Sequence, residues 1–236
     1  MKSKILKAFL VTGFLTIISN MSCEKDLLTD TETVNDIDGN TYKVARIGSQ
    51  IWMAENLKTT RYNNGQTIGT TIPATKDIID EIMPKYQWAY DGDEKNVAVY
   101  GRLYTWYAVI DSRNICPVGW HVPTNAEWDT LVKNIGGENL AGGKLKEKGI
   151  EHWASPNTGA TNESGFTALP GGLRVRYNSM GEFHTIGGSG FWWSFISNGD
   201  NNYSSTNRCL EYNSSLLYSN RYYSAYNGNS VRCIKD

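Results

Sequence analysis

Alternating side chains early in the chain predict a β-hairpin. Tyr, Val and Arg share one face of the extended segment 42–46, a glycine–serine turn lies within 47–50, and the apolar run 51–53 resumes the extended pattern. The segment 36–40 (DIDGN) resembles a calcium loop, but its glycine stands at the fourth rather than the sixth position. We therefore interpret 36–40 as an Asp-Gly turn that opens the hairpin.

Three segments carry the spacing of a helix. The clearest is 124–135, which opens on a threonine with a glutamate three residues later, the sequence of a capping box. The pattern also predicts a short helix within 75–84, ended by a proline, and another over 101–111. In the segment 124–135, the side chains expected to be buried are Trp128, Leu131, Val132 and Ile135.

The texture of the chain changes after residue 165, where glycine, asparagine, serine and aromatic residues predict strands joined by long polar loops. Phe191, Trp193 and Phe195 share one face of a strand and are expected in the core, whereas Trp192 and Ser194 share the opposite face. The order hairpin, helices, strands predicts an α+β fold with a mainly antiparallel sheet and two or three helices.

The N-terminus indicates export. Three lysines precede an uncharged, apolar run that ends at Cys23, which is typical of a secretory signal and short for a membrane span of about 20 residues. The pair Ser22-Cys23 resembles a bacterial lipobox, although Asn20 stands where leucine is usual, and the alternative is ordinary signal cleavage nearby. Lipidation of Cys23 would anchor the chain to a membrane, and the acidic start at 24–26 resembles the signal that sends Bacteroidetes lipoproteins to the cell surface.

The expected organisation is a signal peptide at 1–22, a flexible tether at 23–35 and a single domain at 36–236. Removing residues 1–22 takes away three lysines and no acid, so the net charge changes from -1 to -4. A mildly acidic exported domain lacks the basic surface that nucleic acid requires.

No catalytic sequence motif is present: the chain has no G-x-S-x-G, H-E-x-x-H, Walker loop or dinucleotide fingerprint. Its three histidines, His121, His152 and His184, are scattered, and no cysteine pair has C-x-x-C spacing. The sequence therefore predicts no structural zinc site, no metal and no cofactor.

Five stretches together resemble the Fibrobacter succinogenes major paralogous domain, a family of exported proteins in Fibrobacter and Bacteroidetes. They are 36–65, 100–131 (with ICPVGWH), 165–174 (GFTALPGGLR), 191–194 (FWWS) and 230–236 (SVRCIKD). The resemblance implies a C-type lectin-like fold, which formylglycine-generating enzymes share. The close cysteine pair of those enzymes is absent, and so are the E-P-N, Q-P-D and W-N-D motifs of calcium-dependent lectins.

The resemblance also implies a disulfide between Cys116 and Cys233, which leaves Cys209 as the odd thiol. The rival pairing joins Cys209 to Cys233 across neighbouring strands.

The C-terminal third combines tyrosine and tryptophan with asparagine, a mixture that suits glycan or protein surfaces. We expect a lipid-anchored outer-membrane protein at the cell surface that is a non-catalytic binding module for a glycan or a partner protein. The alternatives are a structural, fimbria-like envelope component and an enzyme acting on polysaccharide or protein. The candidate ligand-binding residues are Trp192, Tyr212, Tyr218, Tyr222, Tyr223 and Tyr226.

Overall fold

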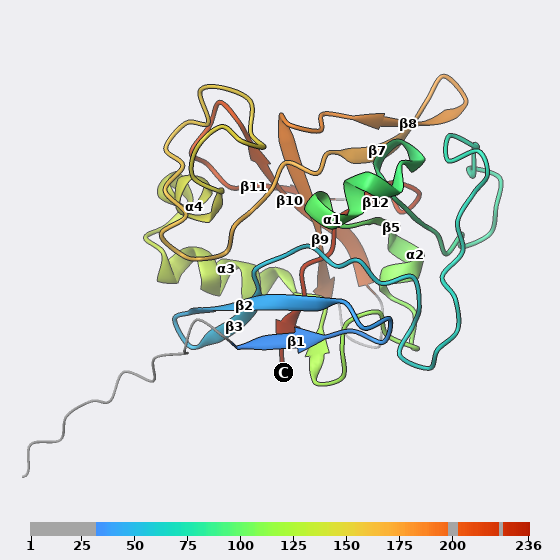
Figure 1. Cartoon of the computed structure of the whole chain (residues 1–236), viewed down its shortest axis with the longest axis horizontal. Coiled ribbons are helices and arrows are strands. Elements are labelled where there is room, and N and C mark those ends of the chain that lie inside the picture. Colours follow the sequence, from blue (N-terminus) through green and yellow to red (C-terminus); the bar gives the residue numbers. More distant parts are fainter. Residues whose placement is uncertain (1–31, 198–202, 222–223) are drawn as a thin grey trace, which may run out of the picture.

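The protein is a mainly antiparallel β structure with short helices, as the sequence predicts (Figure 1). The computed structural model describes residues 32–197, 203–221 and 224–236. The helices are α1 (Val97–Tyr100), α2 (Trp106–Val109), α3 (Asn125–Asn134) and α4 (Glu138–Leu145). The strands are β1 (Thr33–Asn35), β2 (Thr41–Ile47), β3 (Gln50–Met53), β4 (Gln87–Trp88), β5 (Leu103–Thr105), β6 (Trp120–His121), β7 (Leu173–Tyr177), β8 (Met180–His184), β9 (Ser189–Ser197), β10 (Tyr203–Glu211), β11 (Tyr218–Arg221), β12 (Gly228–Asn229) and β13 (Ile234–Lys235).

The first sheet contains the predicted hairpin and joins the beginning of the described chain to its end. Its strand order is β1-β2-β3-β13-β6, so the hairpin β2–β3 pairs with the last strand. The Asp36 carboxylate accepts hydrogen bonds from the backbone N–H groups of Asp38 and Asn40, which confirms the turn expected there. Strand β1 lies within the segment predicted to be a tether, so regular structure begins three residues before Asp36.

Two further sheets complete the fold. One has the order β11-β10-β9 and is built on the nine-residue pairing of β9 with β10. The other has the order β4-β5-β12-β7-β8 and includes the β7–β8 hairpin. Figure 1 shows β9 and β10 running through the middle of the molecule, between the lobe that carries α4 and the lobe that carries β7 and β8.

The predicted helix at 124–135 is confirmed as α3. Thr124 accepts a hydrogen bond from the Glu127 backbone N–H, and the Glu127 carboxylate accepts one from the Thr124 N–H, so the capping box is complete. Trp128, Leu131 and Val132 are buried on its inner face, and the helix ends before the glycines at 136–137.

The other two helix predictions are wrong or partly wrong. Residues 75–84 form turns rather than a helix, because the Asp77 carboxylate binds the backbone N–H of Ile79 and Met83 has a positive φ. Within 101–111, residues 103–105 form β5 and only one helical turn, α2, follows. Here pairing of β5 with β4 and β12 overrides the local helical spacing.

The strand β9 separates two hydrophobic clusters. Trp193 packs in one of them, with Trp106, Trp120 and the disulfide, and Trp192 packs in the other, with Trp52 and Trp128. Because both faces of β9 are covered, alternation along this strand does not distinguish an inner from an outer side. Of the helices that the structure describes, none combines the length and the apolarity needed to cross a bilayer.

The predicted disulfide between Cys116 and Cys233 is confirmed, with the two Cα atoms 5.9 Å apart. It ties the loop before β6 to the residue before β13. The rival Cys209–Cys233 pairing is wrong, and Cys209 is a buried free thiol. Burial raises the pKa of this thiol to about 12, so it is a poor nucleophile.

Candidate functional site

The structure contradicts the expectation that Trp192 lies at the surface. Its side chain is only 1% exposed, and its indole N–H donates to the Asn56 side-chain oxygen over 2.8 Å. The edge of its ring also contacts the Phe166 ring. Trp192 is therefore a core residue, because β9 has a hydrophobic cluster on each face.

The described tyrosines of the C-terminal third do not gather into one site. Tyr212 is half-buried against the cluster that contains Trp192. Tyr226 is half-buried against the Tyr107 ring, and its hydroxyl donates to the Glu81 carbonyl oxygen. Tyr218 is 37% exposed, with its hydroxyl beside that of Ser214. The candidates Tyr222 and Tyr223, like the lipidation candidate Cys23, lie outside the described residues.

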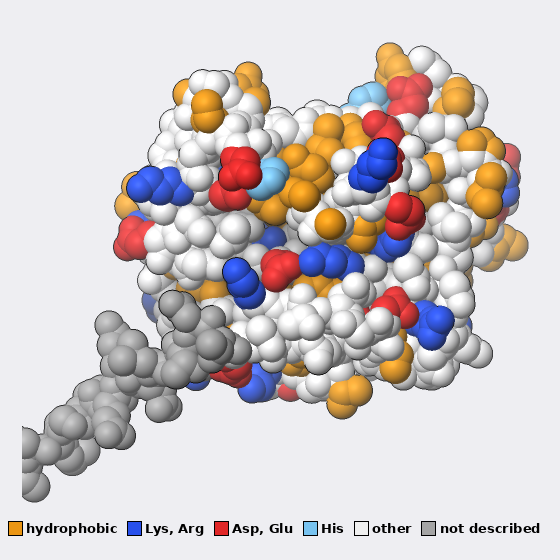
Figure 2. Space-filling model, in the orientation of Figure 1, with side chains coloured by type: hydrophobic (Ala, Val, Ile, Leu, Met, Phe, Trp, Pro, Cys, Tyr) orange, Lys and Arg blue, Asp and Glu red, His pale blue; other side chains and the backbone are white. Residues whose placement is uncertain are grey.

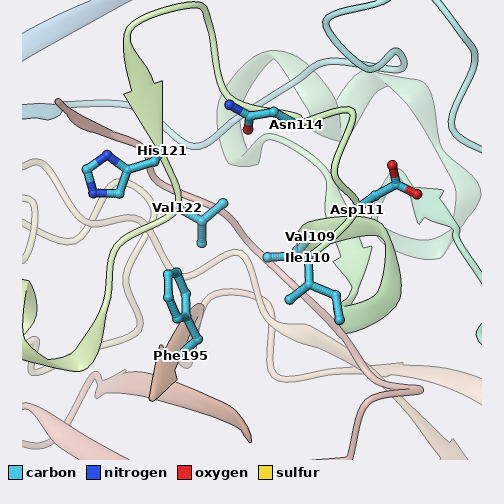
Figure 3. Close-up of a pocket in the computed structure, with 7 residues that line it drawn as sticks. All are labelled: Val109, Ile110, Asp111, Asn114, His121, Val122 and Phe195. Carbon is cyan, nitrogen blue, oxygen red and sulfur yellow. The ribbon is translucent and has the colours of Figure 1, made fainter. Parts of the chain in front are cut away.

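A surface pocket of about 170 Å³ lies instead between α2, β6 and β9. Figure 3 shows the side chains of Val109, Ile110, Val122 and Phe195 around one common space. The residues that line this pocket come from the ends of α2, from β6 and from β9. Asp111, Asn114 and His121 complete the lining.

The Asp111 carboxylate is already bound to basic side chains of the protein. Its carboxylate accepts hydrogen bonds from Arg113 and forms a 2.6 Å ion pair with Lys85, and its side chain is 5% exposed. The Arg113 hydrogen bonds, with the nearby Lys85 ammonium, hold the pKa of Asp111 well below its usual range, although burial acts to raise it. In Figure 3 this carboxylate points away from the apolar space.

The Asn114 side chain is already hydrogen-bonded to the backbone of the protein. Its side-chain amide donates to the Trp120 carbonyl oxygen, and its side-chain oxygen accepts from the Cys116 backbone N–H. The left-handed backbone of Asn114 (φ 54°) suits asparagine in such a turn. Asp111 and Asn114, two of the three polar residues that line the pocket, are therefore already hydrogen-bonded within the protein.

His121 forms a bridge at the rim of the pocket. Its Nε2 lies 2.8 Å from the Glu127 carboxylate, and its Nδ1 lies 2.6 Å from the Asp236 carboxylate. These contacts raise the pKa of His121 to about 9, with the Glu127 hydrogen bond as the largest cause and burial opposing it. Burial acts to raise the pKa of Glu127, but the hydrogen bonds from His121 and Thr124 outweigh it and lower that pKa.

We expect this bridge to make stability depend on pH. Because folding raises the pKa of His121, its contribution is complete below the unfolded value near 6.5 and is lost as the pH rises through about 9. The lowered pKa of Glu127 adds a contribution that is lost as the pH falls through the acidic range. Urea unfolding should show that His121→Gln costs more stability at about pH 6 than at about pH 10. The cost should be modest, because the side chain is 36% exposed.

Glu127→Gln is the matched control for this experiment. Glutamine retains the capping-box hydrogen bond to Thr124 but removes the charge that faces His121. In a Glu127→Gln background, the pH dependence caused by His121→Gln should become smaller. An equal His121→Gln cost at both pH values in the parent chain would contradict the expectation.

No sequence pattern identifies this pocket. Val109, Ile110 and Val122 stand in the motif-rich stretch 100–131, and Phe195 was expected in the core. Their hydrophobic character alone does not distinguish a pocket wall from the core, so only the packing of α2, β6 and β9 could reveal it.

Comparison with protein families identifies one match. Residues 45–235 match the sequence model of the Fibrobacter succinogenes major domain. No curated protein and no solved structure matches the chain.

Proposed function

This chain is a member of the Fibrobacter succinogenes major domain family, and from that premise we propose that it is a lipid-anchored binding module at the cell surface. The module is non-catalytic. It binds a partner protein by accepting one apolar side chain of that partner in the pocket between α2, β6 and β9. The observation that carries the proposal is the apolar lining of this pocket beside polar residues that are already hydrogen-bonded.

The size of the pocket favours one side chain over a glycan. A dry cavity of about 150 Å³ holds a benzene molecule, and the volume here is about 170 Å³. An oligosaccharide needs a longer surface and free donors and acceptors for its hydroxyl groups. Asp111 and Asn114 already use theirs within the protein. A leucine, methionine or phenylalanine side chain fits these conditions.

Lipidation of Cys23 supplies the anchor in this proposal. Strand β1 begins at Thr33, ten positions after Cys23. Ten residues reach at most about 35 Å when fully extended. The domain would thus remain close to the membrane surface and would contact partners there.

Photo-cross-linking in intact cells tests the anchor and the pocket together. We expect a photoreactive residue in place of Ile110 to form one discrete adduct with another surface protein. The same residue in place of Leu140, which is 54% exposed on α4 and outside the pocket, should form none. Cys23→Ser should abolish the Ile110 adduct because the unlipidated protein leaves the membrane.

The outcome separates the candidate ligands. Val122→Asp places a carboxylate in the pocket wall and should remove the adduct if an apolar side chain enters there. Equal adducts at positions 110 and 140, or none at either, would contradict the protein-binding proposal. Binding on a glycan array that Val122→Asp abolishes would instead support a glycan ligand.

A structural, fimbria-like role is the second candidate, and a different surface favours it. Ile72 and Ile82 are 92% and 93% exposed in the loop between β3 and β4. This loop contacts the β7–β8 hairpin through the Gly181 N–H to Thr75 carbonyl bond, and Met180 and Tyr177 there are also exposed. Figure 2 shows apolar side chains along this edge of the molecule. If subunits pack through this edge, a photoreactive residue at Ile82 should give self-adducts in ladders.

The C-type lectin-like arrangement is also part of the proposal. It is supported by the antiparallel sheets, by the pairing of the last strand with the first hairpin and by the disulfide at β13. An experimental structure compared with known lectin-like domains tests it.

A further inference from the structure

A cluster of three metal-ligating side chains lies outside the pocket, in the loop that follows α4. Ligand atoms of Glu147, Glu151 and His152 all lie within 4.8 Å of one another. None of the three lines the pocket between α2, β6 and β9. Figure 2 shows acidic and histidine side chains next to each other on the lobe formed by this part of the chain.

We propose that Glu147, Glu151 and His152 form a binding site for one divalent transition-metal ion of the Zn²⁺ class. One imidazole nitrogen and two carboxylates are a donor set that suits Zn²⁺, whereas Ca²⁺ and Mg²⁺ prefer oxygen alone. The sequence predicts no metal because the histidines are scattered and C-x-x-C is absent. Glu147, Glu151 and His152 nevertheless stand within six positions of each other.

The separation of the donors fits a shared ion. His152 Nδ1 lies 3.0 and 2.8 Å from the two carboxylate oxygens of Glu147. Two donors bound at about 2.1 Å on a tetrahedral ion are about 3.4 Å apart, so the imidazole and the carboxylate need to separate by only about 0.5 Å to hold one Zn²⁺. Glu151 is exposed, and its carboxylate oxygen lies within 4.8 Å of the ligand atoms of both other residues.

The loop that carries the donors is fixed at both ends. The Ala168 carbonyl oxygen accepts from the Glu147 backbone N–H and from the indole N–H of buried Trp153. Between these points, the Asn157 side chain donates to the carbonyl oxygens of Glu147 and Gly149. The Tyr100 ring packs against the His152 ring. Donors held by such contacts lose little conformational freedom when a metal binds.

The charges in the cluster favour a cation. Within the described residues, Glu147 forms an ion pair with His152. No ion pair of the described residues includes Glu151. The neighbouring Lys146 does not neutralise them, because its buried ammonium donates to the carbonyl oxygens of Thr158, Glu211 and Ser214. Two carboxylates this close repel each other, and a divalent ion removes that repulsion.

The chain offers a matched control. His184 Nε2 lies 3.5 Å from the Glu182 carboxylate, so this pair has one imidazole and one carboxylate but no third donor within the described residues. His121 also contacts two carboxylates, but each contacts a different ring nitrogen, so one ion cannot bind all three. Among the histidines of the described residues, only His152 should bind Zn²⁺, together with Glu147 and Glu151.

Isothermal titration of Zn²⁺ alone into the full chain, purified in detergent without a histidine tag, tests the proposal. We expect one Zn²⁺ per chain. Loss of an outer-shell partner costs about 10- to 100-fold in metal affinity, so His152→Gln should weaken binding by at least about 10-fold. Glu151→Gln, an exposed substitution that leaves the core unchanged, should weaken it similarly. His184→Gln should leave the affinity unchanged, and excess Ca²⁺ should not displace the ion.

Thermal unfolding provides a second measurement. A ligand that binds only the folded state raises the unfolding temperature, so Zn²⁺ should raise it in the parent chain and in His184→Gln but not in His152→Gln. Absence of zinc binding, unchanged affinity in both His152→Gln and Glu151→Gln, or an equal loss in His184→Gln would overturn the proposal.

Discussion

Removing the Cys116–Cys233 disulfide should lower the free energy of unfolding by about 4–5 kcal/mol, because the bridge closes a loop of 117 positions. The entropy that the unfolded chain loses on loop closure grows with the logarithm of loop length. The stabilisation expected from a loop this long is therefore near the upper end of the range for disulfides. The bridge also fixes Cys233, the residue before β13. The Cys233 carbonyl oxygen accepts a hydrogen bond from the Met53 backbone N–H, which links this residue to β3.

The measurement is urea unfolding of the Cys116→Ser/Cys233→Ser variant against the parent chain. Cys209→Ala is the matched control, because it removes a buried cysteine that forms no bridge. That change should cost only about 1–2 kcal/mol, the transfer and cavity terms of one small buried side chain. A disulfide variant that loses no more stability than Cys209→Ala would contradict the loop-closure argument.

The second large effect is expected at Asn56, where Asn56→Leu should destabilise the protein by about 3–5 kcal/mol. The Asn56 side-chain oxygen accepts hydrogen bonds from Arg232 Nη2 at 2.7 Å and Nε at 3.2 Å, and from the Trp192 indole N–H. Arg232 is fully buried, and this burial lowers its pKa to about 9. Leucine would leave the guanidinium without its main acceptor in a low-dielectric interior.

Other contacts of Arg232 do not replace that acceptor. Its Nη1 donates to the Phe166 carbonyl oxygen, and its guanidinium lies 4.2 Å from the centre of the Phe166 ring. Both contacts remain in Asn56→Leu, yet Nε loses its only acceptor among the hydrogen bonds described for Arg232. An unsatisfied buried donor costs about 1–3 kcal/mol, and more when it is charged.

Asn56→Asp isolates the role of the acceptor. Aspartate retains the side-chain oxygens that face Arg232 and Trp192, and it loses the amide that donates to the Tyr100 carbonyl oxygen. We expect a loss of about 1–2 kcal/mol, the cost of one unsatisfied buried group. Thermal and urea unfolding of both variants check the order of stabilities. If Asn56→Leu and Asn56→Asp lower the free energy of unfolding equally, the hydrogen-bond acceptor for Arg232 is not the main contribution of Asn56 to stability.

Local sequence patterns were sufficient where one segment determines its own structure. The capping box of α3 lies within four residues, and the β2–β3 hairpin needs only a short turn between alternating strands. The disulfide between Cys116 and Cys233 came from the resemblance to the family rather than from any local pattern. Local patterns were insufficient at 75–84, where turn hydrogen bonds replace the expected helix.

The sequence by itself therefore determined the mainly antiparallel class, the clearest helix and the family. The tertiary structure alone decided which aromatic residues are buried, because packing on both faces of β9 buries Trp192 as well as Trp193. It also decided where the pocket lies. The pocket walls come from residues 109–122 and Phe195, which lie more than 70 positions apart, and no periodic pattern relates them. Long-range contacts such as these depend on how the sheets pack, which a single segment does not encode.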